Sequence, residues 1–159
     1  MNVIGDLVSR DRRSDAVAFR TDSRAGSYSY RAVCTDAWKA GNLLRQYGAR
    51  TGTTVAVDTG RAPTPPPLLA SLGATLLGAT VRFDPHRETD ATALVAPEKT
   101  IASYDPGRGT QVLAYGAVPD ASGVAHFERE AWSENPTRPP ETVSPGTVAV
   151  ATRPASYTH

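Results

Sequence analysis

Apolar residues recur at helical spacing in the segment after Ser29. Steps of three and four separate the members of this stripe: Val33, Ala37, Ala40, Leu44 and Tyr47. Residues at this spacing share one face of a helix and bury it together. Ser29 fits the N-cap, since its hydroxyl oxygen can accept a free N–H of the first turn. Gly48 fits a left-handed cap at the other end, so the pattern predicts a helix between these two residues.

A strand, a helix and a second strand follow along the chain. Thr51-Gly52 makes a turn into the β-branched run Thr53–Asp58, and Thr80–Phe83 forms a second short run. The segment between them predicts a helix from about Pro66 to Leu77, because proline is tolerated in a first helical turn. Its small residues would let that helix lie close against a sheet. This order predicts a βαβ unit with parallel strands.

Weaker patterns flank this unit on both sides. Alternating residues predict a hairpin of Asp15–Arg20 and Ser27–Tyr30 around the turn Arg24-Ala25-Gly26, after a short N-terminal helix capped by Asn2. The rest of the chain predicts three further strands, the last of them buried: Ala93–Ala96, Gln111–Tyr115 and Thr147–Thr152.

A helix is predicted for Gly123–Trp132, and a proline-rich loop for Ser133–Pro145. The helix residues expected to face inward are Val124, Phe127, Ala131 and Trp132. Together the elements predict a single domain over residues 1–159. We expect the α/β class, with a mostly parallel sheet flanked by helices and a small N-terminal β-hairpin.

Charge and cysteine content narrow the class of protein. The 17 basic and 16 acidic residues leave a net charge of +1, which gives no broad footprint for nucleic acid or an anionic membrane. Cys34 is the only cysteine, so no intramolecular disulfide can form, and we expect it to pack as a small apolar side chain. No apolar run approaches the roughly 20 residues that span a bilayer, and the N-terminus lacks a secretory signal pattern. We therefore expect a cytoplasmic protein.

Two local patterns could bind a ligand, and each has a simpler interpretation. His126 and Glu130 are spaced i and i+4 and could share a metal ion, but we favour a solvated helix face. Gly107-Arg108-Gly109 could form an anion-binding turn, but we favour a plain loop tip. The two tryptophans, Trp38 and Trp132, are interpreted as packing residues.

The order of these elements carries a family resemblance. A tyrosine-led helix ends in a glycine, a second glycine precedes a strand, and a later helix ends in Gly-Ala before a strand and Asp-Pro. The positions are Tyr30, Gly48, Gly52, Thr54–Val57, Gly78-Ala79 and Asp84-Pro85. This set resembles the N-terminal part of the adenylate-forming enzymes, the AMP-dependent synthetase/ligase superfamily that includes the acyl-CoA synthetases. The resemblance is best over residues 15–96, looser over 97–159, and implies a truncated N-terminal portion of that fold.

The resemblance also implies which chemical groups to look for. The family holds the ATP phosphates with a loop rich in serine, threonine and glycine that carries a lysine, and a further lysine comes from a separate C-terminal domain. That loop would follow Thr147–Thr152, where residues 153–159 contain neither glycine nor lysine. Ser156–His159 resembles the Thr-His that follows the loop in many members, which makes His159 a candidate for the substrate pocket. We expect no catalytic, metal-binding or cofactor-binding residues, and no ATP-dependent ligation by this chain alone.

The resulting hypothesis is a truncated acyl-CoA synthetase-like protein that acts as a binding or assembly module. Its expected partners are a second copy of the chain or a synthetase. A rival hypothesis is half of a split AMP-dependent acyl-CoA ligase, in which a partner chain completes the site for ATP, Mg²⁺ and CoA. A regulatory domain that binds CoA or a nucleotide, and a remnant without function, are the third and fourth hypotheses.

Overall fold

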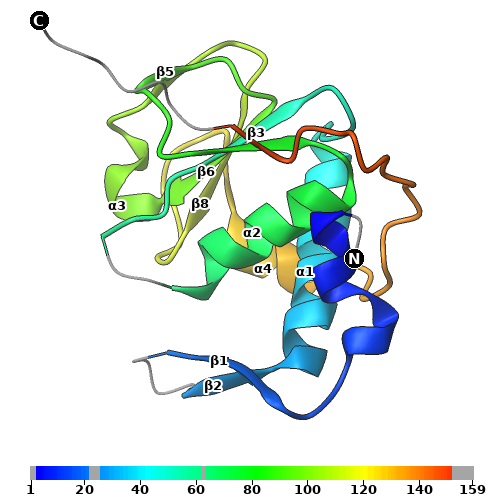
Figure 1. The fold of residues 1–159 in the computed structure, drawn as a ribbon. Coiled ribbons are helices and arrows are strands. Elements are labelled where there is room, and N and C mark those ends of the chain that lie inside the picture. The colour runs from blue at the N-terminus through cyan, green and yellow to red at the C-terminus, as the bar shows by residue number, and fades with distance from the viewer. Residues whose placement is uncertain (1–2, 22–25, 62–63, 152–159) are drawn as a thin grey trace, which may run out of the picture.

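A six-stranded parallel sheet forms the centre of the molecule (Figure 1). The computed structural model describes residues 3–21, 26–61 and 64–151. The strand order is β10-β4-β3-β6-β8-β9, and every neighbouring pair is parallel. The strands are β3 (Thr54–Val57), β4 (Thr80–Phe83), β6 (Ala93–Pro97), β8 (Gln111–Tyr115), β9 (Val124–His126) and β10 (Val150–Ala151). The predicted parallel sheet is therefore confirmed, and the carboxyl ends of its strands lie at one edge of the sheet.

The predicted βαβ unit is β3, α2 (Pro65–Leu76) and β4. Its two strands pair in register, with Val55 opposite Val81. These two valines are fully buried, as expected for the centre of a parallel sheet. The sequence therefore predicted this unit to within one residue at each end.

The long helix α1 (Tyr30–Gln46) begins and ends as predicted. The Ser29 Oγ accepts a hydrogen bond from the Ala32 N–H at 3.1 Å, and Gly48 has a φ of +95°. The buried face is wider than the predicted stripe and also includes Cys34, Trp38, Gly41 and Leu43. The reason is that α1 packs against α2, α4 (Phe127–Trp132) and the N-terminal helical turns as well.

A small residue of α2, Gly73, allows α2 to pack closely against α1. A Cβ on Gly73 would lie 2.5 Å from the backbone nitrogen of Gly41 on α1. No real side chain tolerates that distance, so the backbones approach as closely as they do because Gly73 has no side chain. The prediction that small residues permit close packing holds at this position, with α1 rather than the sheet as the neighbour.

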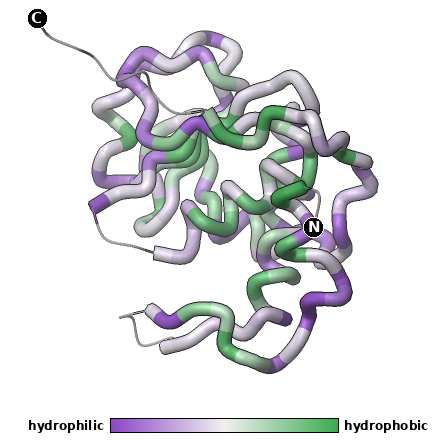
Figure 2. Tube along the Cα trace, in the orientation of Figure 1, coloured by the Kyte–Doolittle hydropathy of each residue, from purple (hydrophilic) through white to green (hydrophobic). Residues whose placement is uncertain are grey.

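Apolar residues of the strands divide between two faces of the sheet. Val55, Val57 and Val95 belong to the larger core under α1 and α2, whereas Ala56 and Leu94 pack in a smaller cluster with Ile101 and Tyr104. The smaller cluster lies under the short helix α3 (Glu98–Ile101) and the segment that follows it. Hydrophobic stretches of the chain gather around the strands and α2 (Figure 2).

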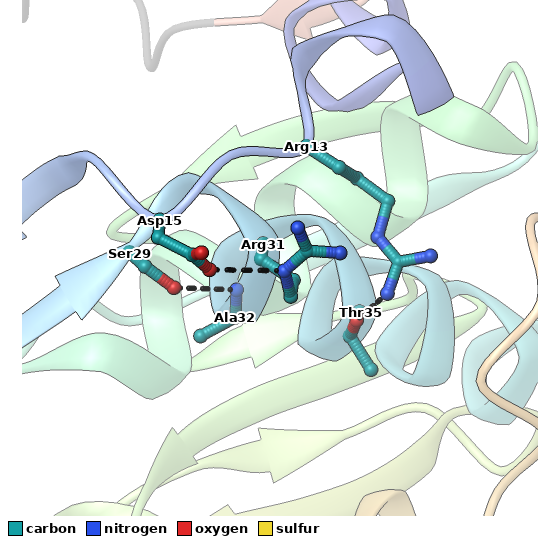
Figure 3. A network of polar contacts seen from close by, with 6 residues as sticks. All are labelled: Arg13, Asp15, Ser29, Arg31, Ala32 and Thr35. Atoms are coloured by element: carbon teal, nitrogen blue, oxygen red, sulfur yellow. Dashed lines mark hydrogen bonds and ion pairs between the residues drawn. The ribbon is translucent and has the colours of Figure 1, made fainter.

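The N-terminal segment is tied to α1 by polar contacts. It contains two 3₁₀ turns, η1 (Ile4–Val8) and η2 (Arg10–Arg12), and the predicted hairpin of β1 (Val17–Arg20) and β2 (Ser27–Ser29). The Trp38 Nε1 donates to the Val8 carbonyl oxygen at 2.8 Å. Figure 3 shows two further contacts, from the Arg13 guanidinium to the Thr35 Oγ1 at 3.2 Å and from Arg31 to Asp15 at 3.1 Å. The predicted cap Asn2 and the turn residues Arg24 and Ala25 lie outside the described residues.

Two C-terminal predictions are wrong. The predicted helix Gly123–Trp132 is a strand followed by a short helix, because Val124–His126 pairs with Val112–Ala114 to extend the sheet as β9. Only α4 is helical, and Trp132 at its end is 79% exposed instead of packed inward. The predicted buried strand Thr147–Thr152 is the two-residue β10, with Val150 42% exposed, since among the described residues β10 has only β4 as a neighbour.

Two further short strands, β5 (Glu88–Thr89) and β7 (Asp105–Pro106), pair in parallel beside the main sheet. The sequence predicted no strand in either segment. Two residues per strand give too short a pattern to recognise. None of the helices in the described ranges combines the length and apolar character needed to cross a membrane.

Candidate functional site

Two aspartates end neighbouring strands at the carboxyl edge of the sheet. Asp58 follows β3 and Asp84 follows β4, and the register places the two positions side by side. The Asp84 Oδ1 accepts two hydrogen bonds from Thr59, one from the backbone N–H at 3.0 Å and one from the side-chain hydroxyl at 2.9 Å. Asp84 has a φ of +47°, a conformation that few residues other than glycine adopt. Its carboxylate thus holds the loop after β3 in place.

Two tyrosines complete this cluster. The Tyr104 hydroxyl donates to the Asp58 Oδ2 at 2.7 Å, and the Tyr115 hydroxyl donates to the Asp58 carbonyl oxygen at 2.8 Å. Burial raises the pKa of both tyrosines, and the negative charge of Asp58 raises it further. Both therefore remain neutral hydrogen-bond donors at neutral pH. The cluster of Asp58, Thr59, Asp84, Tyr104 and Tyr115 is well connected internally and negatively charged.

A pocket of about 320 Å³ lies beside the cluster, at the carboxyl ends of β6 and β8. Its lining combines apolar walls with one ammonium and two carboxylates: Thr64, Pro66, Pro97, Glu98, Lys99, Tyr115, Gly116, Ala117 and Glu128. The carboxyl edge of an open α/β sheet is where such folds usually bind ligands. In this pocket the acidic groups outnumber Lys99, which disfavours a polyphosphate.

His126 and Glu130 do not converge on one point. The His126 Nε2 lies 3.2 Å from the Gly116 carbonyl oxygen, and Glu128, whose Oε2 accepts from the Gly116 N–H at 2.9 Å, is the nearer acid. The Glu130 carboxylate instead accepts a hydrogen bond from the Tyr47 hydroxyl. Within the described ranges no group of three or more His, Cys, Asp or Glu side chains could hold a metal ion.

The remaining candidate residues from the sequence lie in a turn, in the buried core or outside the described residues. Gly107-Arg108-Gly109 is part of a turn closed by the hydrogen bond from the Thr110 N–H to the Gly107 carbonyl oxygen, at 3.0 Å. Cys34 is buried, its thiol lies 3.8 Å from the Ser9 carbonyl oxygen, and burial raises its pKa, which fits packing rather than nucleophilic chemistry. His159 lies outside the described residues.

The outer edge of β10 is the second candidate site. The inner edge of β10 lies against β4. The Val81 N–H donates to the Ala149 carbonyl oxygen at 2.8 Å, and the Thr80 hydroxyl donates to the Val148 carbonyl oxygen at 2.9 Å. No strand of the described chain pairs with the outer edge. Val148 is 61% exposed and Val150 42% exposed there. An edge with free backbone groups and exposed apolar side chains is a template for another strand.

An apolar groove of about 260 Å³ lies next to this edge. It is lined by η1, the end of α2 and the segment that leads into β10: Val3, Ile4, Leu7, Thr75, Gly78, Val143, Pro145, Thr147 and Ala149. Ile4 and Leu7 are exposed large apolar side chains as well. The sequence did not locate this site, because β10 was predicted to be buried.

Solved structures share this fold, although no protein-family model and no curated protein matches the sequence. An acyl-CoA synthetase from Brucella canis has a TM-score of 0.73 and 15% identity, covering 98% of this chain and 32% of that one. The N-terminal domain of FACL13 from Mycobacterium tuberculosis has a TM-score of 0.73 and 14% identity, covering 94% and 41%. The anthranilate CoA ligase AuaEII, solved with anthranoyl-AMP, has a TM-score of 0.67 and 18% identity, covering 85% and 29%.

These similarities extend over nearly all of this chain but less than half of each matched chain. At such low sequence identity, these similarities establish the fold of the chain, but they do not show that it shares an activity with the matched proteins. The chain has the fold of the N-terminal part of the adenylate-forming ligases.

Proposed function

We propose that this chain is an assembly module, which uses the outer edge of β10 and the adjacent groove to bind a second polypeptide. The observation that carries the proposal is the exposure of Val148 and Val150 on an unpaired edge of the sheet in the described part of the chain. Parallel sheets are normally covered, and exposed edges are normally protected by short strands, charge, proline or a covering segment. β10 is short, but its edge carries exposed valines. A strand from a partner would satisfy the free backbone groups and bury both valines.

The partner that we propose is a second copy of the chain, with a synthetase of the adenylate-forming fold as the alternative. We place the protein in the cytosol, without a cofactor of its own. Adenylation by this chain alone is disfavoured by the acidic cluster of Asp58 and Asp84 at the carboxyl edge, since negative charge there repels a triphosphate.

Light scattering during size-exclusion chromatography tests the proposal. We expect a dimer at micromolar concentration. The double variant Val148→Lys/Val150→Lys should be monomeric, because two charges on the edge oppose strand pairing. Val118→Lys is the matched control: Val118 is 51% exposed and lies between β8 and β9, at the opposite side of the sheet. A monomer at every concentration contradicts self-assembly, and the tagged chain is then used to capture a synthetase.

A second candidate is half of a split ligase, which the coverage of about a third of several ligases favours. Here a partner chain would supply the phosphate-binding loop and the second lysine, together with the sites for ATP, Mg²⁺ and CoA. Co-expression with such a partner should yield AMP and pyrophosphate from ATP and a carboxylic acid. Absence of turnover in a stable complex would remove this candidate and leave the assembly role.

A further inference from the structure

Trp132 is a large aromatic side chain held on the surface. It is 79% exposed at the end of α4. The Lys39 Nζ lies 5.0 Å from the ring centre and donates to the Trp132 carbonyl oxygen at 3.2 Å. Lysine thus covers part of one ring face and fixes the backbone, while most of the indole remains in water. Exposed, fixed tryptophans are typical of binding surfaces, where they contribute a large share of affinity.

A groove of about 380 Å³ runs beside this tryptophan. Four elements line it, namely β2, α1, α2 and α4, which lie together below the sheet in Figure 1. The lining residues are Tyr28, Asp36, Lys39, Pro65, Pro66, Leu69, Phe127, Glu128, Ala131 and Trp132. Leu69 and Phe127 are buried, Tyr28 is half-buried with its ring stacked on that of Phe19, and Trp132 is exposed. Apolar side chains and two aromatic side chains, Tyr28 and Trp132, thus contribute to the lining of the groove.

The charges of this groove favour a cation. Two carboxylates, Asp36 and Glu128, face one ammonium, that of Lys39, which already contacts Trp132. Glu128 is engaged by the Gly116 N–H, but no hydrogen bond or ion pair holds the Asp36 carboxylate within the described part of the chain. Burial raises the pKa of Asp36 and the charge of Lys39 lowers it, so a second cation would stabilise its ionised form.

We propose that this groove binds a proline-rich segment of a partner protein in the polyproline II conformation, with an arginine beside the prolines. Proline rings pack between tryptophan and tyrosine side chains in such grooves, and the stiff helix loses little entropy on binding. An arginine would reach Asp36, which a planar guanidinium can bind through two hydrogen bonds. The groove lies away from the β10 edge, so this inference is independent of the proposed assembly.

Fluorescence anisotropy with three labelled peptides tests the proposal on the full chain. The first repeats Arg-Pro-Pro, the second Arg-Gly-Gly and the third Glu-Pro-Pro. The second keeps the positive charge without the stiff helix, and the third keeps the helix with the opposite charge. We expect the Arg-Pro-Pro peptide to bind about tenfold more tightly than either control. Equal binding of all three peptides, or of the two arginine peptides, overturns the proposal.

Two variants locate the binding. Trp132→Ala should weaken the Arg-Pro-Pro peptide about tenfold or more, as for an aromatic hot spot. Asp36→Asn should weaken it several-fold and reduce its salt dependence, while leaving the weak Glu-Pro-Pro binding unchanged or tighter. Val118→Lys serves as the control, and urea midpoints confirm that each variant folds. Unchanged affinity in folded Trp132→Ala overturns the proposal, as does burial of Trp132 by self-association without peptide, seen as a concentration-dependent blue shift of its fluorescence.

Discussion

Gly73 sets the distance between the two main helices. A Cβ at this position would meet the Gly41 nitrogen at 2.5 Å and the Ala40 carbonyl carbon at 2.9 Å, both of them backbone atoms that cannot rotate away. The whole contact between α1 and α2 therefore depends on a hydrogen in place of a methyl group. Helix propensity alone would predict that alanine stabilises this position, because alanine is the better helix former. The close approach of the two helices predicts the opposite effect.

Gly73→Ala should lower the free energy of unfolding by about 1–3 kcal/mol, as overpacking of a tight core does. Urea unfolding followed by circular dichroism measures this change. Gly109→Ala is the control, because a Cβ there meets no heavy atom within 4 Å and its φ is not positive. A Gly73→Ala protein that is as stable as the wild type would contradict the described approach of the helices.

Three tyrosines, Tyr47, Tyr104 and Tyr115, have raised pKa values in the folded state. Burial, then the hydrogen bond to Glu130, raises the pKa of Tyr47 from 10.0 to about 12, and the pKa values of Tyr104 and Tyr115 are raised as well. Above pH 10 the unfolded chain loses these protons while the folded chain retains them. The unfolding free energy should therefore be constant below pH 10 as far as these groups contribute, and fall as the pH rises further.

Tyr47→Phe should make this fall shallower between pH 10 and pH 12, because one of the retained protons is removed. Urea unfolding at a series of pH values measures the slope for both proteins. An identical slope in the variant would show that Tyr47 titrates alike in the folded and unfolded states.

At the scale of elements, a buried hydrogen bond from α1 helps to hold the N-terminal turn η1 in place. The Trp38 Nε1 donates to the Val8 carbonyl oxygen at 2.8 Å, and Trp38 is itself buried. A single 3₁₀ turn has poor hydrogen-bond geometry of its own and gains little stability from it. The groove beside β10 is partly lined by η1, so the attachment of this turn also shapes that groove.

Trp38→Phe should leave the Val8 carbonyl unsatisfied and lower stability by about 1–3 kcal/mol. Hydrogen exchange of residues 3–9 should become faster, while exchange in the central strands changes only with overall stability. Trp132→Phe is the matched control, since its ring lies on the surface. Unchanged exchange of η1 in Trp38→Phe would show that different contacts hold this turn.

Elements with an unambiguous local pattern were predictable, and elements that depend on distant partners were not. Ser29, Gly48 and the βαβ spacing carry local information, and α1, β3, α2 and β4 follow the prediction closely. Val124–His126 is a strand only because β8 offers a free edge, which no local pattern reveals. The exposure of Val150 and Trp132 likewise depends on what lies beside them, so neither candidate binding surface could be located from the sequence.

At the scale of the whole molecule, the two outer strands of the sheet, β10 and β9, have different surroundings. The β9 edge is also unpaired among the described residues and continues directly into α4, whereas the β10 side presents Val148 and Val150 beside an apolar groove. The carboxyl edge between them carries an acidic cluster. This distribution favours protein binding at β10 over chemistry on a triphosphate.

The purified chain, given ATP, Mg²⁺ and a mixture of aliphatic and aromatic carboxylic acids, should form no AMP. The physical reason is that carboxylates outnumber the single ammonium around the pocket at the carboxyl edge. Pyrophosphate release, followed with a coupled assay, measures this directly. Release proportional to chain concentration would contradict the proposed lack of independent adenylation.

Hydrogen exchange at the β10 edge tests the assembly role most directly. Amides of residues 148–151 are measured by mass spectrometry at protein concentrations below and above the expected dissociation of the dimer. We predict that their exchange slows as concentration rises, because a second chain pairs with the edge, and that the Val148→Lys/Val150→Lys variant loses this effect. Fast exchange that does not depend on concentration, with or without a synthetase, would contradict the assembly role.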